Sequence, residues 1–126
     1  MAENKNYISY SDKKGSINIS EDVIAAIAGN AALESDGVAG LYTSPARDLA
    51  EIISKKDTSK GVTVKVEEEG VSADVYILIR PDVSIAERGK GVQQSVKAAV
   101  ESTTGINVVT VNVHVCGIIS QSGKTR

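Results

Sequence analysis

Hydrophobic and polar residues alternate most regularly between positions 62 and 79. Val62, Val64 and Val66 alternate with polar residues, and the alternation resumes over residues 71–79 after two glutamates and a glycine. Two runs of period 2 joined by a short glycine-containing turn predict a β-hairpin with one apolar face. Pro81 has no N–H to donate to a neighbouring strand, so the second strand is expected to end before it.

A helix is predicted from Ser20 to residue 34 or 35, after a short strand at residues 15–19. Ser20 suits the N-cap, and the acidic residues at positions 21 and 22 suit the positive end of the helix dipole. The expected core stripe at helical spacing is Ile24, Ile27, Ala28 and Ala31. The other side of this helix carries small uncharged residues. Two interpretations are open. Another part of the chain, a partner or a second copy covers this side, or the alanines are present only because alanine favours a helix.

Two further helices and a final strand follow. A second helix is predicted after Ser44 and Pro45, with Ala46, Leu49, Ile52 and Ile53 on its apolar face. A third helix is predicted from a capping box at Ser84 to a C-cap at Gly105. It could also start later, because Gly89 and Gly91 would each cost about 1 kcal/mol of stability inside a helix. Its expected core face is Ile85, Val92, Val96, Ala99, Val100 and Thr103. Residues 109–116 then alternate valine with other residues, as a strand does.

The element order β-α-α-β-β-α-β predicts an α+β fold. Because each long strand has one apolar side, we expect a two-layer sandwich with helices on one face of a mixed or antiparallel sheet and the other face open. The open face would carry Lys65, Glu67, Asp74, Tyr76, Leu78, Thr110, Asn112 and His114. We predict one domain over residues 15–119, with flexible tails at 1–14 and 120–126.

Composition narrows the class of protein. The chain has 126 residues, 41% of them hydrophobic, with no Trp or Phe, so the core is expected to be aliphatic. A net charge of −2 gives no overall basic character for binding nucleic acid. The single cysteine, Cys116, suits a reducing compartment. The N-terminus has no signal-peptide pattern, and no stretch approaches the roughly 18 apolar residues of a membrane span. We therefore expect a cytoplasmic protein that reaches a membrane only through a partner.

Catalytic and metal-binding patterns are weak. His114 and Cys116 lie on one side of a predicted strand, but a zinc site needs three or four ligands. Their spacing of about 6.6 Å along a strand is too long for a nucleophile–base pair. Glu67, Glu68 and Glu69 are expected to form a solvated hairpin tip. The sequence therefore predicts no enzyme, no metal and no cofactor.

The segment Arg88-Gly89-Lys90-Gly91 is the alternative candidate site. Glycines with flanking basic residues before a helix can hold phosphate. The segment faintly resembles the backbone-binding loop of KH RNA-binding domains, although its glycines are spaced Gly-x-Gly rather than Gly-x-x-Gly. The other interpretation is a glycine-rich turn that leads into the third helix.

Two segments resemble the alkaline shock protein 23 family, also called the general stress protein 24 family, of Gram-positive bacteria. The first is GSINISEDVIAAIAGNAALESDGVAGL at residues 15–41, in which the matching positions are Gly15, Ile17, Ile19, Ser20, Val23, Ile24, Ile27, Ala28, Ala32, Glu34, Gly37 and Val38. The second is TTGINVVTVNVHVCGI at residues 103–118, which matches at Thr104, Gly105, Val111, Asn112, Val113, Val115 and Gly117. The likeness covers residues 7–119. It departs from the family at residues 80–85, where members often carry an aromatic-Gly pair.

The resemblance implies a non-enzymatic scaffold protein of the envelope stress response. Family members have no established catalytic residues; some are held at the inner face of the membrane by an anchor protein, and some self-associate. We accordingly expect a protein partner, such as a membrane anchor, and a homo-oligomer. We place the contact surface on the open sheet face, at Tyr76, Leu78, Asn112 and His114, with Tyr76 as the aromatic anchor.

Overall fold

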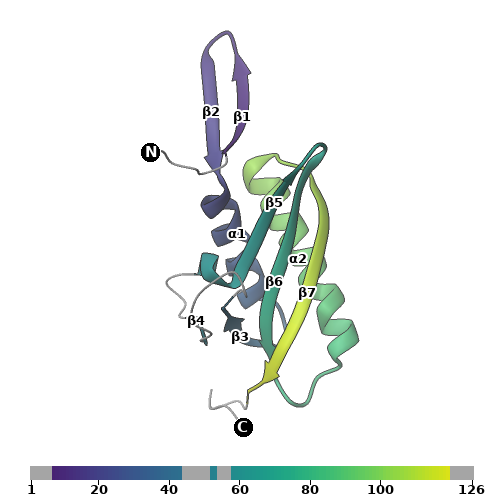
Figure 1. Cartoon of the computed structure of the whole chain (residues 1–126). Helices are drawn as coiled ribbons and strands as arrows, with labels where there is room; N and C mark the ends of the chain where they lie inside the picture. The colour runs from purple at the N-terminus through teal and green to yellow at the C-terminus, as the bar shows by residue number, and fades with distance from the viewer. Residues whose placement is uncertain (1–6, 44–51, 54–57, 120–126) are drawn as a thin grey trace.

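The computed structural model describes residues 7–43, 52–53 and 58–119, and these residues form an α+β fold (Figure 1). The elements, in order, are β1 (Tyr7–Asp12), β2 (Gly15–Ser20), α1 (Glu21–Leu33), β3 (Val38–Tyr42), β4 (Ile52–Ile53), the 3-10 helix η1 (Thr58–Gly61), β5 (Val62–Glu67), β6 (Gly70–Ile79), α2 (Ile85–Thr104) and β7 (Val108–Ile118). The predicted fold class is confirmed. Neither α-helix of this described part is long and apolar enough to cross a bilayer.

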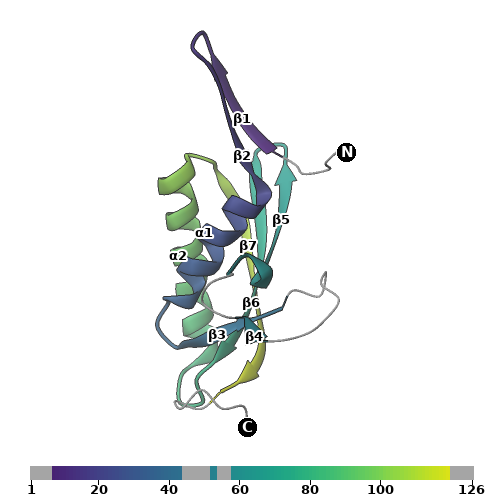
Figure 2. The same cartoon turned by 90° about the vertical axis from the view of Figure 1, so that its left-hand side faces the viewer.

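Strand β6 is the centre of the main sheet. It pairs antiparallel with β5 along its first part and with β3 along its last part, and β4 extends the sheet from β3. On its other side β6 pairs in parallel with β7. Parallel neighbours need a crossover connection, which α2 supplies. Strands β1 and β2 pair only with each other among the described residues and project from the body as a hairpin (Figures 1 and 2).

The core lies between this sheet and a layer made of α1 and α2. Figure 2 shows the two layers from the side, with both helices on one face of the sheet. The fully buried large side chains are aliphatic, as expected from a sequence without Trp or Phe: Ile24, Leu41, Ile77, Ile79, Val71, Val75, Val92, Val96 and Val100. Among the described residues, no helix lies on the second face of β5, β6 and β7, which we call the open face.

The small-residue side of α1 is covered by the protein's own chain. Ala25, Gly29 and Ala32 on this side are buried, whereas Ile27 and Ala31 of the predicted core stripe are only partly buried. The Thr58 hydroxyl of η1 donates a hydrogen bond to the Ala26 carbonyl oxygen at 3.0 Å. A Cβ added to Gly29 would overlap the Thr58 carbonyl oxygen. Glycine is therefore needed here because a backbone approaches the helix closely.

The predicted caps of both helices are present. The Ser20 hydroxyl accepts from the Val23 N–H, and the Ser84 hydroxyl accepts from the Glu87 N–H. Helix α2 begins directly after Ser84, with Gly89 inside it, and ends at Gly105 in the left-handed conformation (φ 77°). Its buried residues are Val92, Val96 and Val100, whereas Ile85 of the predicted core face is 49% exposed.

Three local predictions need correction. Residues 7–12, which we placed in the flexible tail, form β1, because they pair with β2 across the turn at residues 13–14. Ile52 and Ile53, which we placed in a second helix, form β4, because they pair with the edge strand β3. Strand β3 was not predicted. The rest of the predicted second helix up to residue 51, and the C-terminal tail at 120–126, lie outside the described residues.

Candidate functional site

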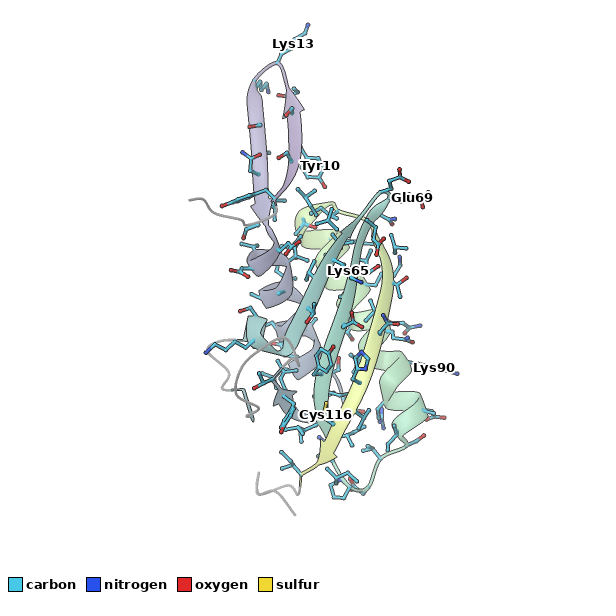
Figure 3. The ribbon with its side chains drawn as sticks, viewed as in Figure 1. Tyr10, Lys13, Lys65, Glu69, Lys90 and Cys116 are labelled. Atoms are coloured by element: carbon cyan, nitrogen blue, oxygen red, sulfur yellow. The ribbon has the colours of Figure 1, made fainter. Side chains whose placement is uncertain are left out.

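The candidate site is the open face of the sheet. On β6, buried residues alternate with the partly exposed Ser72, Asp74 and Tyr76. The strand register brings Thr63 of β5 and Asn112 of β7 beside Asp74. Lys65 and Thr110 lie beside Ser72 in the same way. Figure 3 looks onto this face and labels Lys65 and Cys116 on it.

Two rings stack at the middle of this face. Tyr76 and His114 are directly paired across β6 and β7, and their ring centroids lie 4.6 Å apart with planes inclined by 11°. The His114 Nε2 lies 3.0 Å from the Asp74 Oδ1, an interaction that becomes an ion pair when the imidazole is protonated. The carboxylate and the stack together fix the orientation of the histidine ring. The result is a preorganised aromatic platform that remains partly accessible to solvent.

The phenol of Tyr76 stays protonated at neutral pH. Burial raises the pKa of Tyr76, and the negative charges of Asp74 and of ionised Cys116 raise it further, while a hydrogen bond with the Thr63 side chain lowers it. A raised pKa keeps the hydroxyl able to donate a hydrogen bond. Tyr76 therefore offers a partner both a ring face and a polar edge, which is the combination found in interface anchors.

Leu78 is not exposed on the open face, in contrast to our prediction. Its side chain is only 4% exposed and lies between Gly40 and Gly117. A Cβ added at Gly40 would be 3.7 Å from one Leu78 methyl group, and a Cβ added at Gly117 would be 3.1 Å from the other. The register shifts between Ile77 and Leu78, so that Leu78 pairs with Gly117 and Cys116 is the extra residue. This bulge places a glycine beside Leu78, and the leucine packs against the strand. Of the other predicted contacts, Tyr76 and His114 are in the stack and Asn112 is exposed beside it.

Cys116 and His114 do not form a catalytic pair. The hydrogen-bond acceptor of the Cys116 thiol is the backbone oxygen of His114, at 3.7 Å, and not the His114 ring. Burial raises the pKa of the Cys116 thiol, which keeps it protonated and weakly nucleophilic at neutral pH. In residues 7–43, 52–53 and 58–119, no three His, Cys, Asp or Glu side chains converge as metal ligands would.

The alternative site, Arg88 to Gly91, is helical rather than a glycine loop. The Arg88 N–H is bonded to the Ser84 carbonyl oxygen, so this amide cannot hold a phosphate. The Arg88 guanidinium pairs with Asp36 at 2.8 Å, and its methylenes pack over Gly37. Lys90 is exposed and points away from the body (Figure 3). The cationic groups of the segment therefore do not converge on one ligand.

Sequence reasoning missed the roles of Asp74 and Thr63 in holding the platform. Both alternate with valines and so could be placed on the open face. Their contacts depend on which strand lies on each side of β6, and β7 follows β6 only after the whole of α2. A helix between two strands is the available signal for parallel pairing. With that pairing and the register, the Tyr76–His114 contact could have been found.

Comparisons with known proteins agree with the motifs at both ends of the chain. The sequence profile of the alkaline shock protein 23 family, described as having a cell envelope-related function, matches residues 9–120. The uncharacterized protein YloU of Bacillus subtilis is 39% identical over 108 residues, covering 84% of this chain and 90% of YloU. The uncharacterized protein Spy1614 of Streptococcus pyogenes is 38% identical over 108 residues, covering 84% of this chain and 89% of that protein.

A second Bacillus subtilis protein, the uncharacterized YqhY, is 34% identical over 104 residues, covering 82% of this chain and 77% of YqhY. No solved structure matches the chain. The family match covers the strands and helices that build the open face and its helical support. The chain therefore belongs to the alkaline shock protein 23 family, whose function is related to the cell envelope.

Proposed function

We propose that the protein is a non-enzymatic scaffold of the envelope stress response. It binds a membrane-anchor protein through the open sheet face, and it associates with itself. It acts in the cytoplasm at the inner face of the membrane, where the partner holds it. The envelope-related function of the family supports this role.

The observation that carries the proposal is the stacked pair of Tyr76 and His114 on a sheet face over which no helix of the described residues lies. Tyrosine is enriched among residues that dominate binding energy at protein interfaces. A ring already held by a stack and by neighbouring hydrogen bonds loses little conformational freedom on binding. Asp74 and the exposed Asn112 lie at the next same-face positions of β6 and β7 and place polar groups beside the rings, as in the rim of an interface.

Co-purification with matched tyrosine variants tests the proposal. The tagged full chain, Tyr76→Ala and Tyr7→Ala are each recovered from detergent-solubilised membranes of the host, and the bound proteins are quantified. Tyr7 is the matched control because it is an exposed tyrosine, 54% accessible, at the root of the β1–β2 hairpin and away from the open face. Removing an interface anchor costs about 2 kcal/mol, which lowers the affinity roughly thirtyfold.

We expect the wild type and Tyr7→Ala to retain the same membrane protein and Tyr76→Ala to lose most of it. Thermal unfolding of Tyr76→Ala confirms that the variant is folded. His114→Ala is a second variant that removes the stacking partner and keeps the tyrosine. Equal recovery by all four chains would show that the partner does not bind at this face.

A further inference from the structure

The β1–β2 hairpin is an arm whose contacts with the body, among the described residues, come from its root and from Tyr10. Ile8 and Ile19 pack against the edge of the core, and the Tyr10 hydroxyl donates to the Thr104 carbonyl oxygen at 3.1 Å. Beyond these contacts the arm projects past the rest of the molecule (Figures 1 and 2). An isolated two-stranded hairpin is marginally stable in water. An arm of this kind therefore gains stability if its apolar face packs against another surface.

One face of the arm is apolar and remains exposed. Directly paired residues of an antiparallel hairpin point to the same side, so the pairs Ile8–Ile19 and Tyr10–Ile17 share one face. Ile17 is 64% exposed and Tyr10 is 41% exposed. The opposite face carries the polar residues Ser9, Ser11, Ser16 and Asn18, with Tyr7 and Ser20 at its root.

Opposite charges lie on two projections at the same end of the molecule. The turn of the arm carries Lys13 and Lys14 beside one acidic residue, Asp12, whose carboxylate accepts a hydrogen bond from the Lys14 N–H. The turn between β5 and β6 carries Glu68 and Glu69 after Glu67. Figure 3 labels Lys13 at the far end of the arm and Glu69 at the tip of the β5–β6 turn. In both orientations this acidic turn lies at the level of the root of the arm (Figures 1 and 2). The basic tip is thus at the far end of the arm, which is roughly 20 Å long for six residues of strand, and the acidic turn is near its root.

We propose that two copies of the protein form a two-fold dimer through this arm. When two arms lie antiparallel, the tip of each reaches the root of the other. Lys13 and Lys14 then meet the partner's Glu68 and Glu69, and Ile17 of each copy packs against the partner's Tyr10. A two-fold interface makes each contact twice, so one basic tip and one acidic turn per chain satisfy it completely.

This dimer specifies the self-association in the proposed function and uses a surface separate from Tyr76. The charge complementarity favours a second copy over an unrelated partner, because one chain carries both halves of the contact. The two surfaces also leave the open sheet face free in the dimer, so a dimer can present two such faces. Failure of the Tyr76 test and failure of the dimer are therefore separate outcomes.

Charge exchange measured by sedimentation equilibrium tests the dimer. Three forms of the full chain are compared: wild type, the double variant Lys13→Glu with Lys14→Glu, and the double variant Glu68→Lys with Glu69→Lys. The wild type is expected to form dimers that weaken at high salt, because the contact is partly ionic. Each double variant is expected to raise the dissociation constant about tenfold or more, since like charges then face each other.

Mixing the two double variants gives the decisive measurement. A pair with one copy of each variant again places lysines opposite glutamates at both contacts, so the mixture is expected to recover dimers while each variant alone does not. Lys90→Glu is the matched control, because it alters an exposed lysine on α2 away from the arm and is expected to leave the dimer unchanged. Ile17→Ser tests the apolar contact and is expected to weaken the dimer with little effect on the fold.

Several results would overturn the proposal. A wild-type mass of one chain at every concentration excludes the dimer. A dimer that survives both charge reversals, or a mixture that does not recover it, shows that the arm and the acidic turn do not meet. Assemblies that grow beyond two chains contradict the closed two-fold arrangement. Dimerisation of Ile17→Ser with wild-type affinity excludes the apolar face of the arm from the interface.

Discussion

Replacement of Gly29 by alanine tests whether η1 closes the small-residue side of α1. In a helix interior this change alone would stabilise the protein by about 1 kcal/mol. The new Cβ would, however, overlap the Thr58 carbonyl oxygen and lie 2.8 Å from the Thr58 Cβ. An ordinary carbon contact is about 3.5 Å, so η1 would have to move by at least about 0.7 Å. Such overpacking costs about 1–3 kcal/mol, and contact with backbone atoms places this case at the upper end.

We therefore expect Gly29→Ala to lower the free energy of unfolding by about 2 kcal/mol, which is roughly an 8 °C fall in Tm for a chain of this size. Thermal and urea unfolding followed by circular dichroism measure both values. Gly89→Ala is the matched control, because a Cβ at Gly89 in α2 meets no atom within 4 Å. It should raise the free energy of unfolding by about 1 kcal/mol through helix propensity alone. If Gly29→Ala were as stable as Gly89→Ala, the close packing of η1 on α1 would be wrong.

Three further predictions concern residues of the sheet and of α2. Gly70→Ala should lower the free energy of unfolding by more than about 1 kcal/mol in urea titrations, because Gly70 has a φ of 151° and its Cβ would overlap the carbonyl oxygen of the residue before β7. The pKa of Glu101 is lowered mainly by a hydrogen bond from the Val108 N–H and, to a smaller extent, by one from the Lys97 side chain. The ionised Glu101 carboxylate therefore stabilises the fold fully above its unfolded pKa of about 4.5, and this stabilisation is lost as the pH falls through the lower folded pKa. Urea midpoints measured at decreasing pH should therefore fall less steeply for Glu101→Gln than for the wild type. Asp74→Asn should lower the Tyr76 pKa while burial keeps it above the usual value, as NMR titration of labelled tyrosine can show.

Much of the fold could be predicted because local patterns determine it. The alternating residues of β5 and β6 fix both the hairpin and the face that is buried. Ser84 and Gly105 cap α2 where the sequence predicted, although Gly89 and Gly91 had left a later start open. The arm was missed because residues 7–12 are a short run among polar residues, and their strand is formed by pairing with β2. Ile52 and Ile53 fit a helical spacing, but a neighbouring strand edge overrides such short patterns.

The candidate site was predictable in its residues more than in its contacts. Alternation placed Tyr76 and His114 on the open face. It could not show that they stack, because that depends on parallel pairing across α2. Leu78 was misplaced because the bulge at Cys116 is invisible to a pattern of period 2. Arg88 was treated as free because its partner, Asp36, is distant in sequence and meets it only in the folded chain.

Photo-crosslinking in the host most directly tests the central claim that the open sheet face binds a membrane-anchor protein. A photoreactive amino acid replaces Asn112, an exposed residue of β7 beside the ring stack, or Gln94, an exposed residue of α2 in the helical layer. We expect irradiation to join the chain to a membrane protein from position 112 and not from position 94. Crosslinks from position 94 alone would place the partner on the helical layer and show that the open face is not the binding surface.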